Sequence, residues 1–355
     1  MNRRWLALPA ALAALFAGYA VFWFVGAGKI EEGVEAWAEQ QRAHGLTVEL
    51  GEPRVRGFPA RFTVVLDHPL LADPVEAWRA TSERLRLSAW PWSPRRIELK
   101  TEGKGELAAL NMVGSGEVFC RFEEAVGEIA INDEGKVYAL DITGRNVSIE
   151  QVADEGPITI ASARVAGALE RAGEADYQTR TGEATVELSG LRLPLGSRVL
   201  LGTEIESFDL AATLLGPLPK GELADALAAW RDAGGTLVIT RLDLAWGPLD
   251  LATSGTLSLD ERMRPLGAFT ADIAGYDKTI DELVAHDQIE LGDAVIYKMA
   301  FAILARNADN EDKSLSRVRL PLTVQNGRFA AGTVELFEVP PITEFLKPPS
   351  APQAP

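Results

Sequence analysis

The chain has 355 residues, enough to bury a core in one large domain or in two medium-sized ones. Hydrophobic residues make up 47% and charged residues 24%, which is typical of a folded protein and excludes a disordered one. The formal net charge is −16, so nucleic acid is an unfavourable partner and broad adhesion to anionic lipid headgroups is disfavoured.

The N-terminus predicts a membrane anchor. Arg3 and Arg4 precede an uncharged stretch from Leu6 to Ala27, and the next charge is Lys29. These 22 residues would form a helix of about 33 Å, which matches a bilayer core of about 30 Å. The residues predicted to form the anchor are Trp5, Leu6, Leu8, Leu12, Leu15, Phe16, Val21, Phe22, Trp23, Phe24 and Val25.

The charges on either side of this stretch predict its orientation. Arg3 and Arg4 lie before it, and the acidic Glu31 and Glu32 follow it, which places the N-terminus in the cytoplasm. We therefore expect a single-pass protein of the inner membrane with its bulk in the periplasm. The competing interpretation is a signal peptide cleaved after small residues at 25–27. The uncharged run is longer than the usual 7–15 residues of a signal core, which favours an uncleaved anchor.

An amphipathic helix is expected after the anchor. Ile30, Val34, Trp37, Ala38 and Gln41 have helical spacing, and Gly45 is a natural end for the helix. Packing onto the following domain is favoured over the membrane surface, because the helix is rich in glutamate.

From residue 46 onward, apolar and polar residues mostly alternate, which is typical of antiparallel sheet with one buried face. Turn sequences separate the runs at 132–135, at Gly247-Pro248 and at Asn326-Gly327, the last typical of a type I′ hairpin. The apolar positions of the clearest runs are Phe62, Val64, Leu66, Leu85, Leu87, Ile97, Leu99, Leu249, Leu251, Leu257 and Leu259.

Short helices are expected in the second half. Leu223, Leu227 and Trp230 form one apolar face before Gly234-Gly235. Thr279 and Glu282 have the spacing of a capping box, and Asp293 is positioned to cap a core helix that runs to Leu304.

The predicted class is mainly β (α+β), with an elongated curved antiparallel sheet that forms a groove or partial barrel after a transmembrane helix. A helix bearing Trp37 and a helix bearing Trp230 are each followed by a turn with Gly and Pro, so an internal duplication stays open. The chain divides into a cytoplasmic tip and anchor (1–28), a strand-rich first half (29–220), a second half with helix-hairpin units (221–346) and a Pro-rich tail (347–355).

Candidates for catalysis or metal binding are weak. Cys120 is the only cysteine and lies in an alternating run, so a buried apolar role is favoured over a reactive thiol. The three histidines His44, His68 and His286 are far apart. Gly114-Ser115-Gly116 lacks a nucleophile-elbow spacing, and the acidic loop 307–312 lacks the glycine and final Glu of an EF-hand. We expect no catalytic residue, no metal and no cofactor.

The segment from Trp90 to Arg96 has two interpretations. Two tryptophans around Pro91, followed by Arg95 and Arg96, would suit an interfacial or partner-docking tip. The favoured alternative is a bend between two strands with one tryptophan in the core.

Several motifs together resemble a known bacterial family. They are Arg56-Gly57-Phe58-Pro59-Ala60-Arg61-Phe62, Trp246-Gly247-Pro248-Leu249, residues 255–260 and 264–267, and Leu320-Pro321-Leu322 with Asn326-Gly327. Over nearly the whole chain the sequence resembles the family known as domain of unknown function 2125, which has no established activity. The second group is also similar to patterns in AsmA-like envelope proteins. That resemblance implies a curved sheet associated with handling lipid between membranes.

These observations lead to a functional expectation. A membrane-anchored, non-enzymatic periplasmic protein would hold acyl chains against its apolar sheet face, with the inner membrane and a lipid as its partners. The alternative is an envelope scaffold or assembly factor that acts through protein contacts. An enzyme is the third choice.

Overall fold

The computed structural model describes residues 4–73, 78–110, 117–133, 135–151, 156–170, 176–194, 201–217, 219, 223–286, 289–306, 317–332 and 334–343. The structure is 57% strand and 23% helix with a large antiparallel sheet, which confirms the predicted mainly β class. It forms two compact units. Unit 1 contains residues 1–110 and 120–137, and unit 2 contains residues 111–119 and 138–355.

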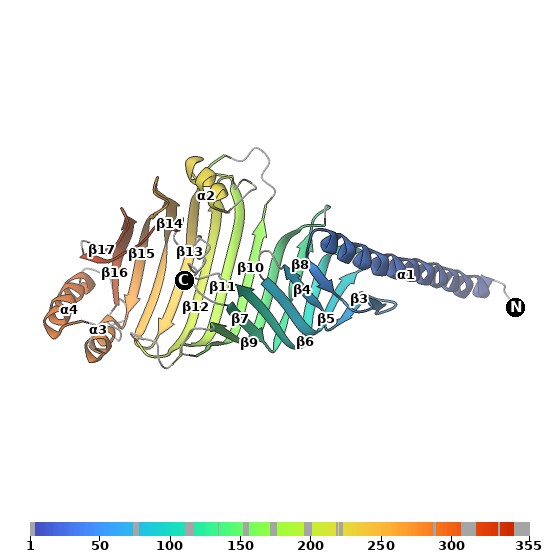
Figure 1. Ribbon diagram of the computed structural model, residues 1–355, viewed down its shortest axis with the longest axis horizontal. Coiled ribbons are helices and arrows are strands. Elements are labelled where there is room, and N and C mark those ends of the chain that lie inside the picture. Colours follow the sequence, from blue (N-terminus) through green and yellow to red (C-terminus); the bar gives the residue numbers. More distant parts are fainter. Residues whose placement is uncertain are drawn as a thin grey trace, which may run out of the picture. The chain divides into compact units, whose positions relative to one another are not determined.

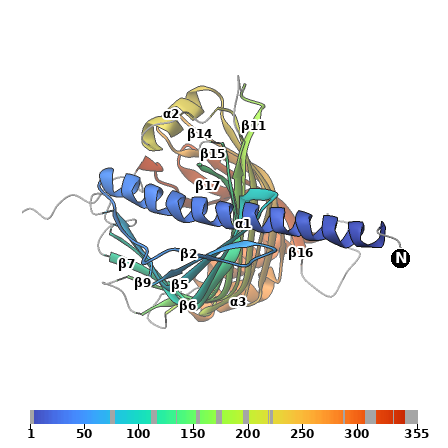
Figure 2. The ribbon, with the colours of Figure 1, turned by 90° about the vertical axis from the view of Figure 1, so that its right-hand side faces the viewer.

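Unit 1 begins with α1 (Arg4–Ala43), one unbroken helix (Figures 1 and 2). In its sheet, β5 pairs with β3 and β4 along one edge and with β6 along the other. Next to these, β2 pairs with β3, β1 pairs with β4, and β8 pairs with β6. The strands are β1 (Thr47–Glu49), β2 (Arg54–Arg56), β3 (Phe62–Asp67), β4 (Leu70–Asp73), β5 (Trp78–Trp90), β6 (Ser93–Leu110) and β8 (Glu124–Ile131), while β7 (Glu117–Phe122) crosses the boundary between the units.

The C-terminal half of α1 packs onto unit 1, as the sequence predicts. Ala38 and Val48 are 2% and 3% exposed, and the Arg42 guanidinium donates two hydrogen bonds to the Val48 carbonyl oxygen, at 2.9 and 2.7 Å. The helix ends at Ala43, just before Gly45 with its positive φ of 96°. One expectation is wrong: Trp37 is 44% exposed, because it points away from the contact that Ala38 makes.

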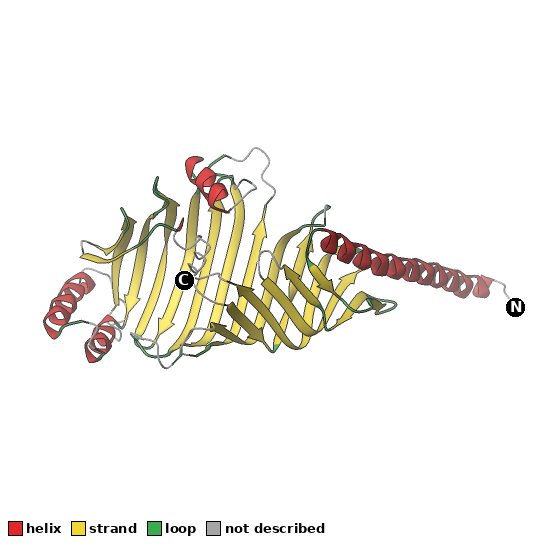
Figure 3. Ribbon diagram, viewed as in Figure 1, coloured by secondary structure: helices red, strands yellow, loops and turns green. Residues whose placement is uncertain are grey.

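Unit 2 is an antiparallel meander in which β9 to β18 pair in chain order (Figure 3). Because each strand follows its neighbour, the sheet is built from local hairpins and short helical connections. The described elements are β9 (Val137–Gln151), β10 (Ile158–Leu169), β11 (Arg180–Arg192), β12 (Glu204–Leu215), α2 (Leu223–Asp232), β13 (Thr236–Trp246), β14 (Leu249–Leu259), β15 (Pro265–Ala274), α3 (Tyr276–Ala285), α4 (Leu291–Arg306), β16 (Arg317–Gln325), β17 (Arg328–Ala331) and β18 (Val334–Glu338).

The predicted strands and turns are found where the alternation places them. Phe62, Val64 and Leu66 are buried on one face of β3. Asn326 and Gly327 connect β16 to β17 with φ values of 56° and 76°, the left-handed pair that a type I′ turn requires.

Helix α2 lies where the sequence predicts a short helix, and its Trp230 is 4% exposed and donates a hydrogen bond to the Leu215 carbonyl oxygen at 2.8 Å. The side chain of Leu223 lies outside the described residues. Two predicted helix starts are wrong. Helix α3 begins at Tyr276 after Gly275, and the Thr279 hydroxyl donates back to the Gly275 carbonyl at 3.0 Å, so Thr279 lies inside the first turn. Asp293 also lies inside the first turn of α4 and is not its cap.

The predicted core helix, α4, is buried on one side only. Ala294 is 3% exposed and belongs to a cluster with Tyr276, Ile280, Val318 and Leu320, against which Tyr297 and Phe301 pack. The other side of α4 faces solvent, because Leu291, Val295, Ile296 and Met299 are 72%, 53%, 63% and 59% exposed.

Candidate functional site: the open apolar face of unit 2

Helix α1 is long and apolar enough to cross a membrane. Within its described span from Leu12 to Ala43, the most apolar stretch has a mean hydropathy of 1.5, and 11% of this stretch is buried. Seven predicted anchor residues have side chains that are 56–71% exposed, as contact with lipid requires: Leu12, Leu15, Phe16, Val21, Phe22, Phe24 and Val25.

The remaining predicted anchor residues differ. Trp5, Leu6, Leu8 and Arg4 belong to α1, but their side chains lie outside the described residues, as does all of Arg3. Trp23 is 3% exposed because it packs on Phe62 of β3.

One face of the unit 2 sheet is apolar across many strands. Ile142 lies opposite Val165, Val165 opposite Val186, Val186 opposite Leu210, and Leu210 opposite Leu242. Each pair joins neighbouring antiparallel strands, so these side chains form one row across β9 to β13. The alternation of apolar and polar residues along each strand therefore produces a continuous apolar surface.

The same face is covered at one end and open at the other. Over β15 and β16, the helices α3 and α4 bury Val318, Leu320 and Ala271, which are 0%, 2% and 0% exposed. Toward β9 and β10, Val165 is 46% and Leu169 is 59% exposed. The described part of the chain thus leaves apolar side chains of β10 in contact with solvent.

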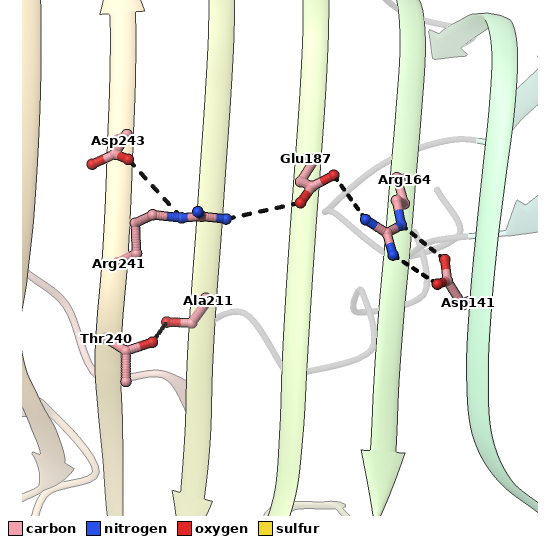
Figure 4. Close-up of polar contacts among 7 residues, drawn as sticks. All are labelled: Asp141, Arg164, Glu187, Ala211, Thr240, Arg241 and Asp243. Carbon is pink, nitrogen blue, oxygen red and sulfur yellow. Dashed lines mark hydrogen bonds and ion pairs between the residues drawn. The ribbon is translucent and has the colours of Figure 1, made fainter.

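The opposite face of the sheet carries a chain of ion pairs (Figure 4). Arg164 of β10 binds both carboxylate oxygens of Asp141 on β9, at 2.9 and 2.7 Å, and reaches Glu187 of β11 at 3.2 Å. Arg241 of β13 reaches Glu187 at 3.8 Å and Asp243 at 4.0 Å. Hydrogen bonds from Arg164 hold the pKa of Asp141 below its usual range.

The ion pair between Arg241 and Glu187 crosses β12 at a small residue. Arg241 lies opposite Ala211 on β12, whose methyl group leaves room for the guanidinium to pass over the strand to Glu187. The two faces of the sheet therefore differ in kind: one is ionic and hydrated, and the other is apolar and partly uncovered.

A second candidate lies in unit 1, where a basic pocket of about 410 Å³ opens on β2, β3 and β5. Arg84 donates a hydrogen bond to Asp67 at 2.6 Å, and this bond lowers the pKa of that carboxyl. The net charge of the chain gives no sign of this pocket. The sequence signal for this pocket is a pair of arginines two positions apart on each of two strands, Arg54 and Arg56 on β2 and Arg84 and Arg86 on β5. This spacing places all four side chains on one face of the sheet. The lining residues are Arg56, Gly57, Thr63, Val65, Asp67, Arg84 and Arg86.

The other sequence candidates do not converge on a site. Burial raises the pKa of the Cys120 thiol, which opposes formation of a reactive thiolate. Among the described residues, no group of three or more His, Cys, Asp or Glu side chains is placed to hold a metal ion. Gly114-Ser115-Gly116 and the acidic loop 307–312 lie outside the described residues.

The segment from Trp90 forms the predicted bend between β5 and β6, but neither tryptophan enters the core. The two indole rings stack on each other with centroids 4.8 Å apart, and the Arg61 guanidinium lies 4.3 Å from the centre of the Trp90 ring. Trp92 is 72% exposed. The favoured placement of one tryptophan in the core is therefore wrong, because the rings cover each other at the turn.

Residues 23–340 match a family described as "Uncharacterized protein conserved in bacteria (DUF2125)". No curated protein matches the chain. The weaker resemblance to AsmA-like envelope proteins stays a prediction.

Proposed function

We propose that this chain, which belongs to the uncharacterised bacterial family DUF2125, is a single-pass inner-membrane protein that binds lipid tails on the open apolar face of unit 2. The bulk of the protein lies in the periplasm, and it performs no catalysis. The observation that carries this proposal is the contrast on one sheet face between buried Leu320, 2% exposed, and uncovered Val165, 46% exposed.

The dimensions and energetics of the face suit an alkyl chain. Five neighbouring strands, β9 to β13, are about 19 Å wide at about 4.8 Å per spacing, and one lipid tail reaches across about half of a 30 Å bilayer core. Burial of each methylene is worth about 0.8 kcal/mol, so binding needs no hydrogen bond from the apolar face. The ionic face stays in water and keeps the sheet soluble.

Site-specific photocrosslinking tests the lipid-binding face. A photoreactive amino acid replaces Val165 on the apolar face, and a matched variant carries it at Ser189, an exposed position on the ionic face of neighbouring β11. After irradiation in cells, mass spectrometry of the purified full chain should find lipid adducts at position 165 and not at position 189. Equal yields at both positions, or no lipid adduct at position 165, would contradict the proposal.

The topology has its own test. A periplasm-dependent alkaline phosphatase fused after Pro355 should be active in cells, because Arg3 and Arg4 hold the other end of the span in the cytoplasm. A fusion reporter active only in the cytosol would exclude both the periplasmic placement and the lipid-binding role.

The exposed side of α4 favours a second candidate function. Leu291, Val295, Ile296 and Met299 present an apolar strip of the kind found at protein interfaces. An envelope scaffold would use this strip to bind one protein of the envelope. The same photoreactive amino acid at Ile296 should then capture one dominant protein, while position 165 captures no lipid.

A further inference from the structure

The turn between β2 and β3 lies against the apolar part of α1. The ring of Phe58 packs on Phe16, Trp23 and Phe24, with centroids 5.9, 5.5 and 5.4 Å apart, and the Tyr19 hydroxyl donates a hydrogen bond to the Pro59 carbonyl oxygen at 2.5 Å. These helix residues all belong to the uncharged run that ends before Lys29. When α1 crosses the bilayer, the turn is therefore at the depth of the lipid tails.

A few residues earlier, the same segment meets the polar part of the helix. The backbone N–H of Val55 donates to the Glu31 carboxylate at 2.8 Å. Arg56 comes between Val55, which is beside Glu31, and Phe58, which is beside Phe24. Arg56 thus lies at the level where the uncharged run ends, and this is the level of the lipid phosphates.

Arg56 belongs to the wall of the basic pocket, together with Arg84 and Arg86. Two carboxylates oppose these three cations: Asp67 binds Arg84, and Glu102 lies 3.4 Å from Arg84 and 2.8 Å from Arg86. Three positive charges against two negative ones leave an excess of one in a chain whose net charge is −16. Within the described part of the chain, no ion pair involves Arg56.

The tryptophan turn lies at the same end of the sheet. Ala89, next to Trp90, pairs with Phe62, and the Arg61 guanidinium lies over the Trp90 ring. Trp92 is 72% exposed, and exposed tryptophans are typical of the boundary between lipid and water. This end of unit 1 therefore has the aromatic residues of a membrane interface on two separate turns.

We propose that the Arg56 pocket binds the phosphate of an anionic phospholipid in the leaflet next to unit 1. An arginine that lies at phosphate depth and has no carboxylate partner gains a charge-assisted hydrogen bond when a lipid phosphate arrives. This proposal rests on the membrane anchor proposed above. It is independent of lipid binding to unit 2, which concerns a different unit and the alkyl part of the lipid.

The test measures retained lipid on the full chain reconstituted in nanodiscs of phosphatidylcholine containing phosphatidylglycerol. Native mass spectrometry should show the protein retaining phosphatidylglycerol above its share of the disc. Arg56→Gln should weaken this retention on the order of tenfold, the effect of losing one hydrogen bond to a charged group. Arg54→Gln is the matched control, because Arg54 lies two residues away on the same strand and is already paired with Glu52. It should retain lipid like the wild type.

Each outcome decides the proposal. Equal retention by the Arg56→Gln and wild-type proteins would overturn it. A control disc of phosphatidylcholine alone, with millimolar inorganic phosphate, separates the two sources of phosphate. If the protein binds inorganic phosphate there in an Arg56-dependent way, and shows no selectivity for phosphatidylglycerol in the mixed disc, the pocket is a free-anion site and the lipid assignment is overturned. Protein that fails to enter the discs would remove the anchor, and with it both proposals, whereas anchored protein without selectivity removes only this one.

A nitroxide-labelled lipid provides a second measurement that does not depend on Arg56. With Cys120→Ser as background, a fluorophore at Trp92→Cys should be quenched by a nitroxide near the headgroup. The same fluorophore at Lys104→Cys, far along β6, should not be quenched. If the nitroxide does not quench the fluorophore at position 92 more than the one at position 104, the pocket lies away from the lipid phosphates and the proposal is overturned.

Discussion

Trp23 of α1 stacks on Phe62 of β3, with ring centroids 5.2 Å apart and ring planes 26° apart. Both side chains are nearly buried, at 3% and 6% exposure, although Trp23 lies in the apolar run of the candidate membrane helix α1. The pair therefore joins the candidate span directly to the first strands of unit 1.

Loss of this stacking should destabilise unit 1. Phe62→Ala removes a buried aromatic ring, which costs about 3–5 kcal/mol. Thermal unfolding of the detergent-solubilised protein, followed by circular dichroism, should show a lower midpoint. Trp37→Ala is the control, because Trp37 is 44% exposed, and its substitution should change stability by less than about 0.5 kcal/mol. Equal effects of both substitutions would contradict the packing described for α1.

Two glycines should respond oppositely to alanine. Gly275 has a φ of 73°, and a methyl group there would collide with the Pro248 carbonyl oxygen, so Gly275→Ala should destabilise unit 2 by about 1–3 kcal/mol. Gly33 lies in α1 with no atom within 4 Å of an added methyl, so Gly33→Ala should stabilise the helix by about 0.5–1 kcal/mol. Chemical denaturation of both variants measures the change in the free energy of unfolding, which should be a decrease for Gly275→Ala and an increase for Gly33→Ala. A stabilising Gly275→Ala would refute the left-handed start of α3.

Two carboxylates that arginines hold, Asp141 in unit 2 and Glu106 in unit 1, predict how stability depends on pH. The folded-state pKa of Asp141 is lowered by Arg164, and that of Glu106 by Arg121 and Arg79. Groups with a depressed pKa stabilise the fold above their unfolded pKa of about 4, and this stabilisation is lost as the pH falls through the folded pKa. The melting temperature should therefore be nearly constant from about pH 7 to 5 and fall below about pH 4.

The ion pairs of Arg164 can be tested by mutation. Arg164→Ala should lower the melting temperature at pH 7 and reduce its fall in acid, because Asp141 loses both of its hydrogen bonds. Arg192→Ala removes a longer and more exposed ion pair, in which Arg192 lies 3.7 Å from Glu204. It should leave the melting temperature at pH 7 and its fall in acid unchanged. An acid profile for Arg164→Ala that equals the wild-type profile would exclude this role.

Cys120 should react slowly in the native protein. Its partial burial raises the pKa of the thiol, so the thiolate is scarce at neutral pH. A maleimide reagent should label the native chain slowly at pH 7 and label the chain quickly in denaturant. Rapid native labelling would contradict the described burial.

The sequence predicts those parts of the structure that depend on local patterns. The alternation at Phe62, Val64 and Leu66 fixes a strand and its buried face, and Asn326-Gly327 fixes a turn, because period and backbone conformation are local properties. The first residue of a helix is harder to predict from local sequence. Thr279 and Asp293 resemble caps, yet α3 begins after the left-handed Gly275 and α4 begins at Leu291, so both residues lie inside the first turn.

The candidate sites depend on register and exposure, which local patterns do not contain. Periodicity places Val165 and Leu320 equally on apolar faces, but only the position of α3 and α4 decides which one is covered. Likewise, Arg56 and Arg86 meet in one pocket because β2 and β5 both pair with β3, a long-range arrangement that no motif encodes.

The absence of any break in α1 has a mechanical consequence. The helix is held on unit 1 at two distant points, by the Trp23 ring on Phe62 and by the Arg42 guanidinium on Val48. An insertion of one residue between them, for instance at Gly33, would rotate one set of contacts by about 100° and shift it by about 1.5 Å relative to the other. The number of residues between the two contacts is therefore fixed by the positions of Phe62 and Val48 in unit 1, and any tilt of α1 is transmitted rigidly to this unit.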